Sequence, residues 1–302
     1  MARKRKSNAT SWRYVIFQPA LWFLLATVGM IFGAIQLWHS QYQNLIDLPG
    51  YEISREQIQV NAPPKWVDRD LPGAILENLP QPASLLDRQL VSKAVTTCEA
   101  LPWVEKIAHI EKVATGLDVE LLYRQPIGLV EISTSSGQQA VDRHGVLMDP
   151  RLMDYVNAEK LIRISVARPG LEQQKVWTVW ADHRVVDAAS IGSLPGAAWD
   201  QLGAYRIVSW DPPGSKSNQN PFEIWPRTAR GLKIIWGSAP GKEKSGEALA
   251  EQKLELIRQY LAKQQPGDEK DQGRKIDVRS GVVQRVDDLQ TALWPDFEDQ
   301  WK

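Results

Sequence analysis

The sequence predicts an α+β protein with a single N-terminal transmembrane helix, and three observations support this fold class. Residues 19–38 contain no charged side chain. One strand-like and two helix-like patterns follow, and strand patterns then dominate until a late helix and a closing strand. Elements grouped in such blocks are typical of α+β folds. We therefore expect a β-α-α-β-β module, then a mixed β-rich domain with a C-terminal helix and closing strand.

The uncharged stretch 19–38 predicts one crossing of a membrane. At about 1.5 Å per residue, a helix of this length covers about 30 Å, the thickness of the hydrocarbon core of a bilayer. It is longer than the roughly 7–15 apolar residues of a cleaved signal peptide, so we expect an uncleaved anchor. The side chains expected to lie in the lipid include Trp22, Phe23, Leu24, Leu25, Ile31, Phe32 and Trp38.

Charge is unevenly distributed and predicts the orientation of this helix. The whole chain has 36 basic and 36 acidic side chains. Five of the basic ones precede the span, at Arg3, Lys4, Arg5, Lys6 and Arg13. The positive-inside rule therefore places the N-terminus in the cytoplasm, and everything after the span in the periplasm or another extracytoplasmic space. The remaining 31 basic side chains (36 − 5) against 36 acidic ones argue against a nucleic-acid partner.

The first elements after the span are a short strand and two helices. Alternation over 57–60 predicts the strand. Asp70 is a good N-cap for a short helix over 70–79, with a proline in its first turn. From 84 to 101 the apolar residues recur at helical spacing, and Pro102 ends that helix.

Alternating patterns then predict strands. Residues 104–113 form one candidate strand, and 117–123 alternate most regularly between apolar and charged side chains. A further pair is expected over 128–132 and 139–142, joined by a serine- and glycine-rich turn.

The second half continues with strands and one helix. The expected strands are 161–166, 177–181, 205–210, 222–225 and 232–236. A helix is predicted over 247–263, where apolar side chains share one face. Residues 275–286 close the domain as a strand or hairpin. The final segment, 287–302, is acidic and aromatic; it is either a short partner-binding motif or a frayed terminus, and the second is favoured.

We find no pattern that indicates catalysis or cofactor binding. The four histidines, His39, His109, His144 and His183, are too scattered for a metal site, and Cys98 has no cysteine partner. The sequence contains no nucleophile elbow and no glycine-rich phosphate loop. We therefore expect a protein that is not an enzyme and has no cofactor, metal or small-molecule substrate.

Five segments resemble the FtsQ/DivIB family of bacterial cell-division proteins. They are Ala100-Leu-Pro-Trp-Val-Glu-Lys106, Leu117–Pro126, Val141–Leu147, Gly231–Gly237 and Lys275–Arg279. The resemblance implies a basic cytoplasmic tail (1–18), a transmembrane helix (19–39), a POTRA-like domain with its linker (40–126), an FtsQ-like β domain (127–286) and an acidic aromatic tail (287–302). It also implies a scaffold at the division septum that joins two other single-span proteins, FtsB and FtsL.

A scaffold of this kind needs exposed strand edges, because an unpaired edge offers backbone donors and acceptors to a partner segment. The closing element is the first candidate edge, with partner contacts expected at Ile276, Val278, Arg279, Val282, Val283 and Val286. A second candidate is the strand 104–113.

Three other functions stay open. The chain could be a POTRA-bearing accessory of envelope assembly or secretion, although 150–286 lacks the lipid-facing strands of an outer-membrane barrel. It could be a membrane-anchored cell-wall enzyme, which would need a cluster of catalytic side chains in the folded protein. It could also be a structural spacer.

Overall fold

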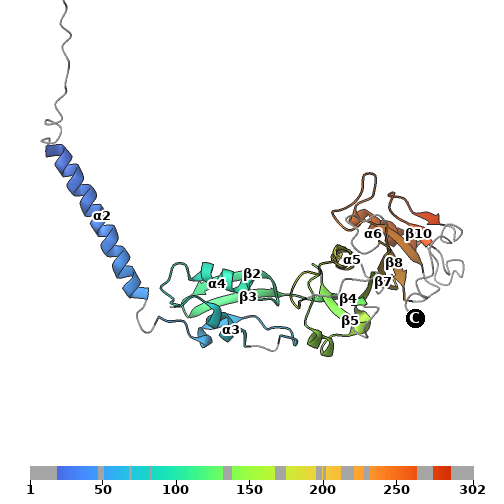
Figure 1. Cartoon of the computed structure of the whole chain (residues 1–302), viewed down its shortest axis with the longest axis horizontal. Coiled ribbons are helices and arrows are strands. Elements are labelled where there is room, and N and C mark those ends of the chain that lie inside the picture. Colours follow the sequence, from blue (N-terminus) through green and yellow to red (C-terminus); the bar gives the residue numbers. More distant parts are fainter. Residues whose placement is uncertain are drawn as a thin grey trace, which may run out of the picture. The chain divides into compact units, whose positions relative to one another are not determined.

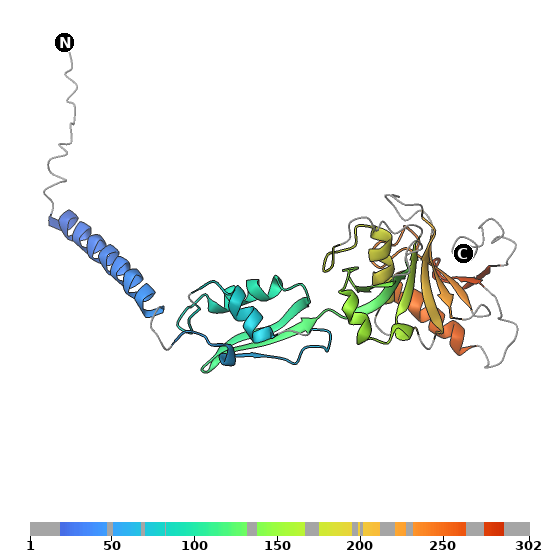
Figure 2. The ribbon, with the colours of Figure 1, turned by 60° about the horizontal axis from the view of Figure 1, so that its bottom comes forward.

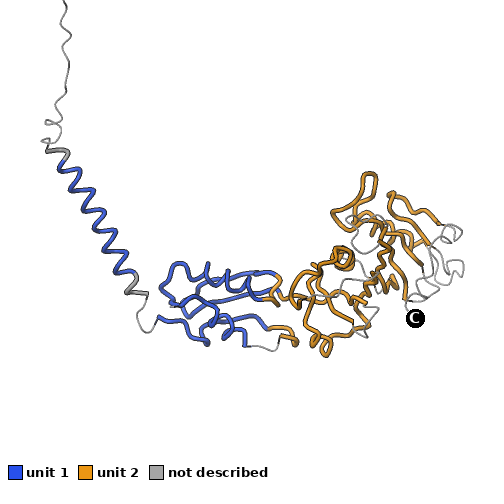
Figure 3. Tube along the Cα trace, viewed as in Figure 1, with its two compact units in different colours: residues 1–62, 69–101, 106–122 blue, residues 63–68, 102–105, 123–302 orange. Residues whose placement is uncertain are grey.

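The computed structural model is a mixed α+β structure with one N-terminal apolar helix. It describes residues 19–46, 51–67, 70–81, 83–131, 138–166, 175–194, 199, 202–211, 221–227, 232–263 and 275–286. The chain divides into two compact units (Figure 3). Unit 1 comprises residues 1–62, 69–101 and 106–122, and unit 2 comprises 63–68, 102–105 and 123–302.

Helix α2 (Pro19–Ile46) contains the predicted span (Figure 1). It is the one helix among the described residues that is long and apolar enough to cross a membrane. The seven side chains expected in lipid are all exposed, from 52% at Leu25 to 77% at Phe23. An apolar helix with an exposed surface of this kind is suited to lipid rather than to water.

After α2 and the short 3-10 turn η1 (Arg55–Gln57), unit 1 follows the order β-α-α-β-β. Its elements are β1 (Ile58–Val60), α3 (Leu71–Asn78), α4 (Leu90–Glu99), β2 (Val104–Val113) and β3 (Gly116–Tyr123). The sheet order is β1-β3-β2, and β1 runs parallel to β3. Along β3 the alternating residues Leu117, Val119, Leu121 and Tyr123 are buried, whereas Asp118, Glu120 and Leu122 are exposed, so the prediction of a half-buried strand is confirmed.

Helix α4 is shorter than the predicted helix 84–101. Ser84 instead forms an isolated bridge with Glu52. The carboxylate of Asp87 accepts a hydrogen bond from the Gln89 N–H (2.8 Å) and pairs with Lys93 (2.8 Å). Side chains that bond to nearby backbone groups compete with the helix, so these bonds hold a turn until Leu90.

The predicted cap of α3 takes a different role. Asp70 occupies the N-cap position, but its side chain makes no capping hydrogen bond. Its carboxylate pairs instead with Arg55 (2.7 Å). The ion pair is largely exposed, so we expect it to contribute little to stability.

Cys98 lies on α4 and is completely buried. Burial raises the pKa of its thiol to about 11. The thiolate is the reactive form, so we expect iodoacetamide at pH 8 to leave Cys98 unmodified in the native chain. Mass spectrometry checks this, with the guanidinium-unfolded chain as the fully alkylated control. Complete alkylation of the native chain would contradict the buried position.

Unit 2 is built on an eight-stranded mixed sheet. Its strands are β4 (Pro126–Glu131), β5 (Gln138–Asp142), β6 (Ile162–Val166), β7 (Ala204–Ser209), β8 (Phe222–Pro226), β9 (Lys233–Gly237), β10 (Lys275–Asp277) and β11 (Gln284–Val286). The strand order is β11-β10-β9-β8-β7-β6-β4-β5. β10 is parallel to β9, and β11 is antiparallel to β10.

The main core of unit 2 lies between one face of this sheet and two helices, α5 (His183–Gly192) and α6 (Ala250–Ala262). Figure 2 shows the twisted sheet with α6 in orange beside the strands. A smaller apolar cluster includes Leu129 and Ala140 of β4 and β5, and Leu152 of the 3-10 turn η2 (Pro150–Asp154). A second 3-10 turn, η3 (Ala158–Lys160), follows.

Two predictions in the second half were incomplete. The expected strand 177–181 is only an isolated bridge between Val179 and Val146, and Trp177 there has a positive φ of 67°. Helix α5 was not predicted, although Asp182 caps it by accepting from the Arg184 N–H (3.0 Å). The other four expected strands and the helix within 247–263 are present.

Candidate partner-binding edge

The closing segment forms a hairpin at the end of the sheet. β11 pairs with β10, and no other described strand lies on its outer side. An end strand of this kind presents unpaired backbone groups, to which another chain can add a strand.

The register shows which groups of β10 face the hairpin partner. Val278 donates its N–H to the carbonyl oxygen of Ile235 on β9 (3.3 Å). Backbone groups of successive strand residues point alternately to the two sides. The groups of Lys275 and Asp277 therefore point away from β9 and towards β11.

The same register identifies the outward groups of β11. Lys275 lies opposite Val286, and Asp277 lies opposite Gln284. Because directly opposed residues exchange both hydrogen bonds in alternate pairs of an antiparallel ladder, Gln284 and Val286 bond inward. The N–H and carbonyl of Arg285 then point outward. Arg285 was not among the contact residues predicted from the sequence, since only the strand register identifies it.

Two of the expected contact residues fill the core instead. Ile276 and Val278 have no exposed surface and belong to the main apolar cluster. Their side chains could meet a partner only after unit 2 unfolds locally. The cause is general: apolar residues on one face of an end strand pack against the protein's own core, whereas strand addition uses backbone groups.

The other expected contacts surround the hairpin connection. Val282 is 63% exposed and lies in this connection. Val283 packs partly against the main cluster, and Val286 is half-buried. Arg279 pairs with Asp277 (2.6 Å), an interaction that raises its pKa. Leu249, not selected from the sequence, is 58% exposed.

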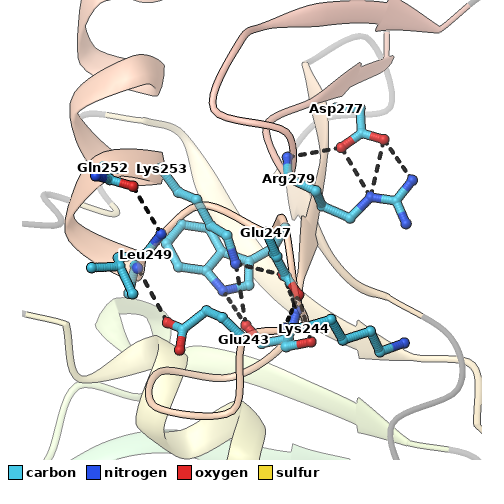
Figure 4. A network of polar contacts seen from close by, with 11 residues as sticks. Glu243, Lys244, Glu247, Leu249, Gln252, Lys253, Asp277 and Arg279 are labelled. Atoms are coloured by element: carbon cyan, nitrogen blue, oxygen red, sulfur yellow. Dashed lines mark hydrogen bonds and ion pairs between the residues drawn. The ribbon is translucent and has the colours of Figure 1, made fainter.

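A polar network centred on Glu247 supports the hairpin from the side of α6 (Figure 4). The Glu247 carboxylate accepts hydrogen bonds from the Ser238 N–H (2.6 Å), the Ser238 hydroxyl (2.8 Å) and the Lys244 N–H (3.0 Å). It also pairs with the Lys253 ammonium (2.7 Å). Burial alone raises the pKa of Glu247, but these partners outweigh burial and lower the pKa to about 2.

Lys253 makes this network energetically sensitive, because its side chain is fully buried on α6. Its ammonium lies 5.1 Å from the centre of the Trp236 ring. A buried ammonium is tolerated only when it is paired and hydrogen-bonded. Glu247 is the carboxylate that pairs with it.

Further contacts attach the hairpin to the sheet and to the loop before α6. The Ala248 N–H donates to the carbonyl oxygen of Arg279 (2.7 Å). Lys275 forms a buried ion pair with Glu223 of β8 (2.6 Å), across the intervening β9. These contacts hold the closing hairpin against the rest of unit 2, so its edge is presented in a defined position.

Comparison with known proteins gives no match: no protein-family model and no curated protein is similar to this chain.

The second candidate edge is β2, which ends the sheet of unit 1 on the side opposite to β1. Its bounds, Val104–Val113, are the predicted ones. Most of its residues are exposed or half-buried, and His109 pairs with the neighbouring Glu111 (3.3 Å). Among the described strands, only β3 is a neighbour of β2.

Asp142 lies two residues before His144 and makes structural contacts. The Asp142 carboxylate accepts from the backbone N–H groups of His144 and Val146 (both 2.8 Å) and pairs with Arg124 (2.5 Å). His144 lies 3.3 Å from Glu105. His39 is exposed on α2. Within the described ranges, no group of three or more His, Cys, Asp or Glu side chains could hold a metal ion. The acidic aromatic tail, 287–302, lies outside the described residues.

Proposed function

We propose that this protein is a non-enzymatic, single-span scaffold of the bacterial division machinery. Its N-terminus is cytoplasmic, and the chain after α2 lies in the periplasm or another extracytoplasmic space. The apolar helix α2 supports the anchor, and the basic residues before it support the orientation. The β-α-α-β-β order of unit 1 is the order expected of a POTRA-like module. The five segments that resemble the FtsQ/DivIB family support the division role.

One observation contributes most to this proposal: the end position of β11 and the outward direction of the Arg285 backbone groups. A partner resembling FtsB or FtsL would add an extended segment there, with main-chain hydrogen bonds supplying affinity. Two exposed apolar side chains are available as further contacts: Val282 in the hairpin connection, and Leu249 next to Ala248, whose N–H donates to the Arg279 carbonyl. The end strand β2 is a second surface for a membrane-proximal partner.

Proline at position 285 tests this edge without breaking the hairpin. Arg285→Pro removes an outward donor, and proline is tolerated on the outer side of an end strand. Val282→Pro is less informative, because Val282 lies in the connection outside the β10–β11 ladder. Arg285→Ala is the matched control, since it removes the side chain and keeps the N–H.

The experiment uses a fluorescent protein fused to the cytoplasmic tail in dividing cells. We expect wild type and Arg285→Ala to form midcell rings that recruit the downstream single-span proteins. Arg285→Pro should reduce that recruitment by about tenfold or more, since each lost backbone pairing weakens strand addition. Uniform membrane label of the wild type would contradict the division role. Equal recruitment by both Arg285 variants would contradict docking at this edge.

A further inference from the structure

The guanidinium of Arg163 on β6 is buried without a matching anion. Arg163 is 9% exposed, and its Nε and Nη1 have no hydrogen-bond partner in the described structure. Arginine remains charged in proteins. A buried charge requires a pairing partner, so this side chain indicates a missing anionic ligand.

A second arginine lies directly beside it. Arg206 of β7 is the register partner of Arg163. Glu131 accepts from Arg206 Nη2 (3.2 Å) and from the Ser165 hydroxyl (2.5 Å), while Arg206 Nε has no partner among the described groups. The Tyr205 ring lies 5.5 Å from Arg163 Cζ and 5.8 Å from Arg206 Cζ. Two guanidinium groups therefore lie beside one aromatic ring, and among the described residues Glu131 pairs with Arg206 but not with Arg163.

From β7 to β10 the same face of the sheet carries polar and aromatic side chains, together with the buried aliphatic residues Val208 and Ile235. Residues that alternate with the core positions lie on this face, and neither described apolar cluster of unit 2 includes them. Lys233 lies 4.4 Å from the Trp225 ring centre, and the Trp210 and Trp225 rings are 5.8 Å apart. Arg163, Arg206, Lys233, Lys275 and Arg279 are cationic, against Glu131, Glu223 and Asp277. The face, defined by these residues, is therefore net positive.

The segment that follows β11 has the complementary composition. Residues 287–302 contain the acids Asp287, Asp288, Asp296, Glu298 and Asp299, the aromatics Trp294, Phe297 and Trp301, and one base, Lys302. Five strand spacings of about 4.8 Å separate β11 from β6, about 24 Å in all. An extended chain covers about 3.3 Å per residue, so roughly eight residues reach Arg163. Asp296, Glu298 and Asp299 follow Val286 by at least ten residues, so the chain is long enough for these acids to reach Arg163.

We propose that residues 287–302 bind in cis across this face. Carboxylates among Asp296, Glu298 and Asp299 pair with the Arg163 and Arg206 guanidinium groups, and the tail aromatics pack against Trp225 and Tyr205. Bidentate pairing of arginine with carboxylate is the chemistry that this site offers. The proposal does not depend on the division role, and it leaves the outer side of β11 available.

A peptide added in trans tests the site. The probe is a fluorescein-labelled peptide of residues 287–302, titrated into a chain that ends at Val286 in lipid nanodiscs. This chain retains every described residue, and protection of Cys98 from alkylation, together with an unchanged circular dichroism spectrum, reports its folding. We expect saturable binding by fluorescence anisotropy. The full-length chain should bind the probe at least about tenfold more weakly, because its own tail occupies the site at high effective concentration.

Matched variants identify the residues. Arg163→Gln in the shortened chain should weaken binding about tenfold or more, as expected for a lost charge-assisted hydrogen bond. Arg258→Gln on α6 should change it less than twofold. A probe carrying Asp296→Asn, Glu298→Gln and Asp299→Asn should bind as weakly as the Arg163→Gln chain binds the native probe. Absence of binding, equal binding by the full-length chain, or insensitivity to Arg163→Gln would each overturn the proposal.

Discussion

Replacing Glu247 by alanine is expected to lower the free energy of unfolding of unit 2 by about 3–5 kcal/mol, the usual cost of leaving a buried charge unpaired. The ammonium of Lys253 is fully buried, and Glu247 is the carboxylate within 2.7 Å of it. The substitution also removes the acceptor of the Ser238 N–H and hydroxyl. These bonds support the loop before α6, where the Ala248 N–H donates to the carbonyl oxygen of Arg279. The closing hairpin should therefore loosen together with α6.

Hydrogen exchange of the full-length chain in increasing urea measures this effect, read from peptides that contain α6 and β10. Glu255→Ala is the control, since Glu255 is exposed on the same helix and pairs with Arg258 at 3.8 Å. It should change the stability by less than about 0.5 kcal/mol, in the range of exposed ion pairs. Equal effects of the two substitutions would show that the Glu247 pair is not the support that we describe.

The pH dependence of the same site has a defined sign. The pKa of Glu247 is lowered from its ordinary value of 4.5 to about 2. A group with a lowered folded-state pKa stabilises the fold above its unfolded-state pKa, and this stabilisation is lost as the pH falls through the folded-state value. Wild type should therefore lose stability between about pH 4.5 and 2, and Glu247→Gln should show a shallower loss over this window.

Alanine at Gly116 is expected to disrupt unit 1. A Cβ added there would lie 1.8 Å from the backbone oxygen of Gln57, and φ is +155°. The Gln57 oxygen and the added Cβ are both held by paired strands, because Gln57 directly precedes β1 and Gly116 begins β3. Relieving the clash would therefore disturb the pairing of β1 with β3. Overpacking costs about 1–3 kcal/mol and an unfavourable backbone conformation about 1–3 kcal/mol. The parallel pairing of Ile58 with Leu117 should be lost first.

Hydrogen exchange at the amides of β1 reports this change. The control is Gly203→Ala in unit 2, where φ is +62° and no atom lies within 4 Å of the added Cβ. This control should lower the free energy of unfolding by roughly 1–2 kcal/mol, the cost of holding a residue with a Cβ in the left-handed conformation. If Gly116→Ala leaves the exchange of β1 unchanged, the close approach of Gln57 to Gly116 is wrong.

Elements with strong periodicity could be predicted from the sequence. The alternation over 117–123 identified β3, and the apolar stripe within 247–263 identified α6. Helix α5 was missed although its signals are present: Asp182 as cap, apolar residues at helical spacing, and Gly192 at its end. The turn before α4 could not be predicted in full, because Ser84 bridges to Glu52, which only the fold brings close, although the contacts of Asp87 with Gln89 and Lys93 are local in the sequence.

The candidate edge could be predicted as a segment but not as a set of residues. The chain order placed a strand or hairpin over 275–286, and the structure places a hairpin at the end of the sheet. The apolar residues Ile276 and Val278 were selected as contacts, but their apolar character reflects the core that they fill. Arg285 has no sequence signal, because its importance comes from the direction of its backbone groups.

Photo-cross-linking in living cells tests the central claim most directly. A benzophenone amino acid replaces Gln284, an exposed residue of β11, in the full-length membrane-anchored chain. We predict a covalent adduct with another single-span membrane protein, at equal yield in the Arg285→Ala background and at least about tenfold lower yield with Arg285→Pro. No adduct at position 284, or an adduct of equal yield in both backgrounds, would contradict strand addition at this edge.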